Sequence, residues 1–169
     1  MLRINYIFHL EVEQLYLHPE ITALMPDLRG SARLEAIEHD VMVMNVEAPP
    51  HLIQPLNENI SLHEALGWLF VAESSTLATA FLQKFAKKLG LTRYSGASHI
   101  CTDPDLYFLN WRNFTATIDT IVTNTVEEAK AIKGTQDALT RAFTLLNTLQ
   151  TFPEQLLRKQ PEYFLPEAR

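Results

Sequence analysis

Residues 62–89 read LHEALGWLFVAESSTLATAFLQKFAKKL, an apolar stretch with helical spacing and clear signals at both ends. Before it, Ser61 and Glu64 have the spacing of a capping box, in which each side chain bonds to the backbone N–H of the other residue. After it, Gly90 is typical of the end of a helix. The stretch therefore predicts one long helix of roughly 42 Å, at about 1.5 Å per residue.

Polar residues interrupt this helix near its midpoint, where residues 72–80 read AESSTLATA. Serine and threonine inside a helix can donate to the carbonyl oxygen three or four residues earlier, and such bonds bend helices. We therefore expect a kink at Ser74, Ser75 and Thr76. Glu73 falls within an apolar stripe of the same helix, so we expect its side chain to be at least half buried. The other members of this stripe are Leu66, Phe70, Leu77 and Phe81.

Small side chains continue along one face of the predicted kink. Ser74 and Ala78 are four residues apart and face the same way, and Phe81 and Phe85 extend the strip. Two interpretations fit this pattern. The kink either wraps the helix around the core or against a neighbouring helix, or it lets another molecule approach the backbone closely.

The rest of the chain also favours helices, because hairpin dipeptides and long apolar–polar alternation do not occur in it. Periodicity predicts further helices over about residues 2–17, 32–45, 104–121 and 126–149, with a short helical turn near 21–25. We expect Ser31 to cap the second helix, and Thr125 with Glu128 to form a capping box for the last. Gly134 is expected to be a weak point in that last helix.

These elements predict an all-α fold with antiparallel helices in a single domain over residues 1–169. From Phe152 the chain carries three prolines, so we expect an irregular tail there.

Composition excludes several classes of protein. The net charge of −6 argues against a nucleic-acid surface. The single cysteine, Cys101, excludes an internal disulfide, and no apolar run reaches the roughly 18 residues that span a membrane. No signal peptide is recognised at Met1, so we expect a cytoplasmic location.

No conventional catalytic or metal motif stands out. His39 lies between two acidic residues with Glu35 one turn earlier, but the paired Glu-x-x-His motifs of a di-iron bundle do not occur. His99 and Cys101 alone are too few for a zinc site. Since Walker, dinucleotide-binding and nucleophile-elbow motifs are also missing, we expect no metal site and assign no catalytic residue.

The segment LGWLFVAESSTLATAFLQKFAKKLGL, followed by WRNFTATID, resembles the bacterial biliverdin-producing heme oxygenases. The resemblance extends from about residue 4 to 150. It implies a heme oxygenase-like fold in which a long kinked helix, the distal helix, lies across one face of the heme. Family glycines let its backbone approach closely, and Ser74, Ala78 and Thr79 stand in their places, each adding atoms toward the heme pocket.

The resemblance also implies the function. Heme would be both substrate and cofactor, and oxidative cleavage would give biliverdin, carbon monoxide and ferrous iron with electrons from a donor protein. Ser74, Ser75 and Ala78 would line the distal side, so that Ser74→Leu abolishes heme binding. By its charge, Arg112 is a candidate partner of the heme propionates. The same holds for four further basic residues, which otherwise cover a solvated helix face and end: Lys84, Lys87, Lys88 and Arg93.

The N-terminal region differs from the family pattern. The segment INYIFHLEVEQLYLHPEI resembles the second helix of the family, so we expect the helix with the iron-ligating histidine to be absent and His9 to hold a second-helix position. An alternative function follows: a non-catalytic scaffold that binds heme, another apolar ligand or a protein partner. An apolar cleft left by the missing helix would favour such a partner or a homodimer.

Overall fold

The computed structural model describes residues 1–101 and 104–149, and the regular elements of this part of the chain are all helical. Isolated bridges join Thr92 to Ser95 and Gly96. The all-α prediction is therefore confirmed. The predicted tail from Phe152 lies outside the described residues.

The N-terminal third of the chain forms short helical elements that turn back on one another. They are α1 (Leu2–Val12), η1 (Glu13–Leu17), α2 (Pro19–Leu24), η2 (Leu28–Ser31) and α3 (Leu34–Val43), where η denotes a 3-10 helix. The helix predicted over residues 2–17 thus tightens into a 3-10 turn after Val12. It ends at His18, whose extended ψ of 126° precedes Pro19.

Ser31 does not cap the second predicted helix, because α3 begins only after Arg33. The Ser31 hydroxyl lies instead 2.7 Å from the carbonyl oxygen of Leu28 and 2.9 Å from the Glu73 carboxyl, and these two acceptors share its single proton. The predicted cap was therefore wrong, and the serine joins two distant segments instead.

The C-terminal part holds the longer helices. They are α4 (Leu62–Ser74), η4 (Ser75–Ala78), α5 (Thr79–Lys88), η5 (Ser98–Ile100), α6 (Pro104–Ile121) and α7 (Thr125–Leu149), and η3 (Pro50–Leu52) lies in the link before them. The capping box of Ser61 and Glu64 is confirmed at the start of α4. No single helix in the described ranges is long and apolar enough to cross a membrane, whereas α4 and α5 taken together meet that length and composition across a bend of 55°.

Asn124, and not Thr125, caps α7. Its side-chain oxygen accepts hydrogen bonds from the backbone N–H groups of Val126 and Glu127, both at 3.1 Å. Thr125 lies inside the first turn, so the predicted box of Thr125 and Glu128 was wrong. The asparagine one residue earlier provides the acceptor that the first turn needs.

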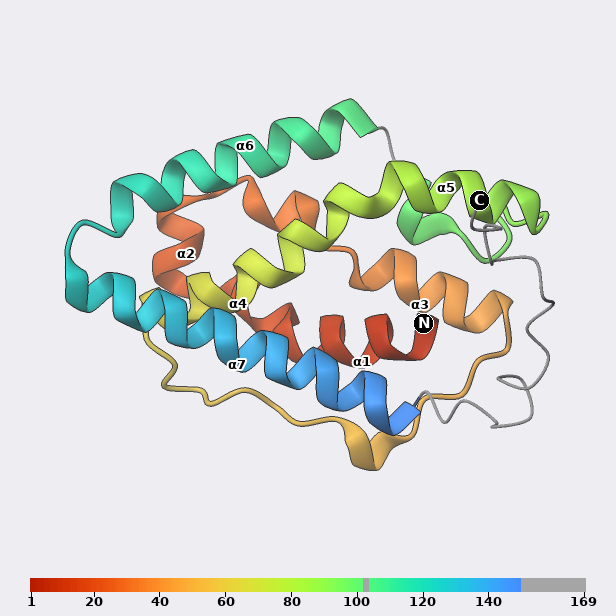
Figure 1. Cartoon of the computed structure of the whole chain (residues 1–169), viewed down its shortest axis with the longest axis horizontal. Coiled ribbons are helices and arrows are strands. Elements are labelled where there is room, and N and C mark those ends of the chain that lie inside the picture. Colours follow the sequence, from red (N-terminus) through yellow and green to blue (C-terminus); the bar gives the residue numbers. More distant parts are fainter. Residues whose placement is uncertain (102–103, 150–169) are drawn as a thin grey trace, which may run out of the picture.

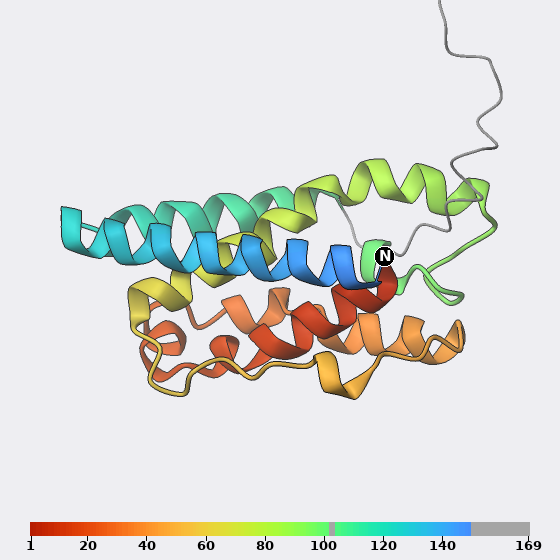
Figure 2. The same cartoon turned by 60° about the horizontal axis from the view of Figure 1, so that its bottom comes forward.

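α4 crosses the middle of the molecule (Figure 1). It contacts α6 and α7 on one side and α1 and α2 on the other, and Figure 2 shows α5, α6 and α7 along one face with α1, α2 and α3 along the opposite one. Side chains from all these elements except α3 and α5 meet in the main core. Its most deeply buried members include Ile7, Leu15, Ile21, Leu66, Leu69 and Leu145.

Two glycines set how closely α4 and α7 approach. A Cβ at Gly67 would lie 2.1 Å from the carbonyl oxygen of Ala131, and a Cβ at Gly134 would lie 2.1 Å from that of Glu64. Both distances are far inside van der Waals contact, so only glycine fits at either position. Gly134, expected to weaken its helix, is thus a requirement of the helix crossing.

Candidate functional site

The predicted helix over residues 62–89 is broken at the stretch rich in hydroxyl groups. Each hydroxyl bonds back to the carbonyl oxygen three residues earlier: Ser74 to Val71 at 3.0 Å, and Ser75 to Ala72, Thr76 to Glu73 and Thr79 to Thr76, each at 2.6 Å. These bonds accompany the 3-10 turn η4 and the 55° bend between α4 and α5. The predicted kink is confirmed, and its cause is the predicted one.

The kink has a core side and an open side. Glu73, Thr76 and Thr79 are all buried on the core side. Thr79 therefore does not extend toward the open side, contrary to expectation, because its hydroxyl is buried against the Thr76 carbonyl. Although Thr79 stands in the place of a family glycine, its side chain therefore does not obstruct the open side.

The open side carries small and apolar side chains. Ser74 is half-buried, and Ser75 and Ala78 are exposed, as a docking face requires. Further along, Leu77 is 39% and Phe81 is 63% exposed, so apolar surface continues on this side toward α5. The open face below is this set of side chains: Ser74 at the end of α4, Ser75, Leu77 and Ala78 on η4, and Phe81 on α5.

On the core side, Glu73 is held by two hydroxyl groups. Its Oε1 accepts a hydrogen bond from the Tyr16 hydroxyl at 2.5 Å and one from the Ser31 hydroxyl at 2.9 Å. Burial raises the pKa of Glu73, and the two hydrogen bonds and the charge of Arg33 oppose that shift. The expectation that Glu73 is at least half buried is confirmed, since its exposed fraction is 2%.

Arg33 is the residue before α3, and its side chain extends to the kink. Its guanidinium donates to the Ser75 hydroxyl, to the carbonyl oxygen of Ala72 at 3.5 Å and to Nε2 of His9 at 3.1 Å. Burial, followed by the charge of Arg33, lowers the pKa of His9 to about 3. His9 is therefore neutral at physiological pH, and its Nε2 serves as an acceptor.

Arg33, Tyr16 and Ser31 were not identified as site residues from the sequence. Their contacts with the kink join residues 42 or 57 positions apart, and no local pattern reports such a pairing. The sequence indicated such partners only through the predicted burial of Glu73, because a buried carboxylate requires hydrogen-bond donors nearby.

Arg112, the predicted propionate partner, is exposed on α6. α6 passes beside η4, and the neighbouring Trp111 packs against Phe70 of α4 with ring centroids 5.0 Å apart. The Arg112 side chain makes no hydrogen bond or ion pair with the part of the chain described here, and its role stays a prediction.

Four of the histidines are placed away from the open face or bonded elsewhere. His9 binds Arg33, and Nδ1 of His99 lies 2.6 Å from the buried Asp40 carboxylate. His63 lies 3.8 Å from Glu127. The turn η3, which holds His51, lies on the opposite side of the molecule from α5 in both overall views. No group of three or more potential metal ligands occurs within the described residues.

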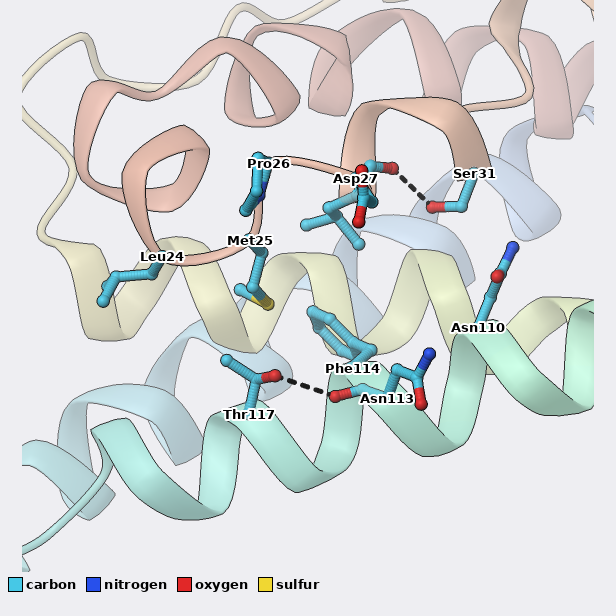
Figure 3. A pocket seen from close by; sticks show the side chains of 10 residues that line it. Leu24, Met25, Pro26, Asp27, Ser31, Asn110, Asn113, Phe114 and Thr117 are labelled. Carbon is cyan, nitrogen blue, oxygen red and sulfur yellow. Dashed lines mark hydrogen bonds between the residues drawn. The ribbon is translucent and has the colours of Figure 1, made fainter.

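Two of the cavities in the described part of the chain lie beside α6. One of about 200 Å³ lies between the α2–η2 segment and α6, and Figure 3 shows Asn110 pointing toward Ser31 at its rim. The other, about 680 Å³, is a largely apolar groove between α4, α6 and α7 beside Phe70. Neither is lined by Ser74, Ser75 or Ala78, so neither is the open face.

A heme ring fits the open face by its chemistry. The face offers small side chains at Ser74 and Ala78, where a flat macrocycle can approach the backbone, and apolar surface at Leu77 and Phe81. An imidazole for the iron is not offered by His9, whose Nε2 is occupied by Arg33.

Comparison with known proteins shows to which family the chain belongs. The family model described as heme oxygenase matches residues 5–148. Heme oxygenase PigA of Pseudomonas aeruginosa is 37% identical over 142 residues, which cover 84% of this chain and 72% of PigA. The NO- and CO-bound heme oxygenase of Neisseria meningitidis has a similar structure, with a TM-score of 0.75 and 29% identity over 98% of this chain and 81% of that one. From the kink, its small open-side residues and these matches we conclude that the chain belongs to the heme oxygenase family.

Proposed function

We propose that this chain binds heme against the open face and degrades it oxidatively to biliverdin, carbon monoxide and ferrous iron. The observation that carries the proposal is the kink itself, which occurs in a chain of this family and turns Ser74, Ser75 and Ala78 outward. Heme, when bound, supplies the iron at which oxygen is reduced and is also the molecule that is opened.

The side chains of the open face have defined hydrogen-bonding capacities. The Ser74 hydroxyl donates to Val71, so toward the heme side it can only accept, for example from an ordered water. Ser75 donates to Ala72 and accepts from Arg33, which fixes its orientation. Ala78 contributes only a methyl group. The chain thus presents a compact surface of small side chains that can order water.

Positive charge at the edge of this face suits the heme propionates. Arg112 on α6 and Lys84 on α5 are both exposed and can reach outward to carboxylates. Because the reaction consumes electrons, we propose an electron-donor protein as a partner. We also propose that the reaction takes place in the cytoplasm. Homodimer formation stays a prediction.

The test is a turnover assay of the purified protein with hemin, oxygen and ascorbate, with catalase added to remove free peroxide. We expect the absorbance of bound heme to disappear as that of biliverdin appears, with release of carbon monoxide. Bleaching of hemin without biliverdin, at the rate seen without protein, would contradict the proposal.

A further inference from the structure

Glu73 occupies a position where an apolar residue would be expected. It lies in the last turn of α4, one residue before the break, on the core-facing stripe that includes Leu66 and Leu69. A buried carboxyl group is costly unless its oxygens are hydrogen-bonded, and a leucine of similar size would avoid that cost. The requirement for a carboxyl here therefore lies in the bonds that it makes.

Both bonds to Glu73 come from the N-terminal layer. Tyr16 belongs to η1 and Ser31 to η2, so the carboxyl oxygen joins the end of α4 to two separate turns that lie 57 and 42 residues away in the sequence. Tyr16 is itself buried, and its hydroxyl makes no other described hydrogen bond. The two donors and the acceptor thus form a three-point contact directly behind the kink.

The hydroxyl back-bonds of the kink have a different effect. They are local, each spanning three residues, so they weaken the regular helix and permit a bend. They do not determine the direction of α5 relative to the rest of the molecule. A contact with elements far away in the sequence is needed for that.

We propose that Glu73 is a positioning residue, which accepts from Tyr16 and Ser31 and thereby fixes where α4 ends and how the open face is presented. Its importance for heme rests on the proposed function, but the contact acts in the heme-free protein as well. Arg33 holds the same turn from its exposed edge through Ser75 and Ala72. Glu73 and Arg33 thus anchor the kink at two points.

The first experiment measures amide hydrogen exchange in the heme-free full chain. Glu73→Leu removes the acceptor, whereas Glu73→Gln keeps a carbonyl oxygen at the same place. We expect exchange of amides 75–79 to accelerate roughly tenfold to a hundredfold in Glu73→Leu, the effect of losing a strong buried hydrogen bond. Glu73→Gln should stay within about threefold of the wild type. Glu128→Leu, at an exposed site on α7 whose side chain makes no described bond, is the matched control.

A second variant guards against a general loss of stability. Glu73→Leu alone leaves the Tyr16 hydroxyl buried without a partner, whereas Tyr16→Phe with Glu73→Leu removes both groups and should restore global stability. In that double variant, amides 75–79 should still exchange faster than in the wild type. Unchanged exchange there, or an equal acceleration throughout α7, would overturn the proposal.

Hemin titration then connects the contact to the ligand. We expect the apparent Kd for hemin to rise at least fivefold in the double variant and to stay near the wild-type value in Glu73→Gln. Equal Kd values in the double variant and the wild type would overturn the positioning role for heme. If the wild-type protein itself shows no saturable binding, the proposed function fails, whereas the exchange result still decides whether Glu73 positions the kink.

Discussion

Gly134→Ala tests how closely the two central helices are packed. Alanine has a higher intrinsic helix propensity than glycine by about 1 kcal/mol, so at an unconstrained helical site this change stabilises a protein. At Gly134 the new Cβ would lie 2.1 Å from the carbonyl oxygen of Glu64 and 2.9 Å from its Cα, both backbone atoms that no side-chain rotation can move. Relief requires α4 and α7 to separate by about 1 Å, since real Cβ contacts are essentially never closer than 3.0 Å.

Such a separation weakens the packing along the whole crossing. A gap of 0.5–1 Å forfeits about a quarter to a half of each dispersion contact, and overpacked core positions typically lose about 1–3 kcal/mol. Because the clash is with backbone atoms, we expect the upper end of this range. After the propensity gain of about 1 kcal/mol, Gly134→Ala should lower the free energy of unfolding by about 2 kcal/mol in urea titrations followed by circular dichroism. Gly30→Ala is the control, because a Cβ there meets nothing within 4 Å. A Gly134→Ala protein as stable as the wild type would refute this account of the crossing.

Three further perturbations follow from the contacts. Burial and Arg33 lower the pKa of His9 to about 3 from 6.5, so the unfolded chain takes up more protons below about pH 6.5 and stability falls as the pH falls. The loss from His9 alone should be about 2 kcal/mol between pH 7 and pH 5, and urea titrations of His9→Gln should lack it. Arg141→Leu leaves the Glu11 carboxylate, now 2.8 Å from Arg141 Nε, buried and unpaired, which should cost about 3–5 kcal/mol that Glu11→Leu in the same chain largely restores. Asn124→Ala should cost about 1 kcal/mol in the same assay and Thr125→Ala less than about 0.5 kcal/mol; the reverse order would contradict the assignment of the α7 cap.

The sequence predicts those features of the fold that have local causes. The kink follows from hydroxyl groups bonded three residues back, and the start of α4 follows from Ser61 and Glu64, so both are visible within a few residues. Burial of Glu73 was predicted from its apolar stripe, but Phe70, Leu77 and Phe81 of that stripe are exposed, and Glu73 is buried on the side of Leu66 and Leu69. The predicted helix caps at Ser31 and Thr125 were wrong because residue type alone does not determine at which residue a helix begins. At α7 the cap is Asn124, one position before the residue predicted.

What the sequence leaves out is long-range pairing. Arg33 with Ser75 and Glu11 with Arg141 join residues 42 and 130 positions apart, and each pair is fixed only once the helices have packed. The role of Gly134 belongs to the same class, because a glycine that lowers helix propensity locally becomes necessary only where another helix crosses. The open face was identified from the hydroxyl groups of the kink together with the family resemblance. The role of this face in heme binding stays a proposal.

The central claim is that heme lies against the small residues on the open side of the kink. The most direct measurement is a hemin titration, followed through the Soret band, of the wild type, Ser74→Leu and Thr120→Leu. Thr120, like Ser74, is a hydroxyl residue bonded to the carbonyl three residues earlier, but it lies near the far end of α6. The account predicts saturable binding by the wild type and Thr120→Leu, and its loss in Ser74→Leu. Unchanged hemin binding by a folded Ser74→Leu protein would show that heme does not occupy this face.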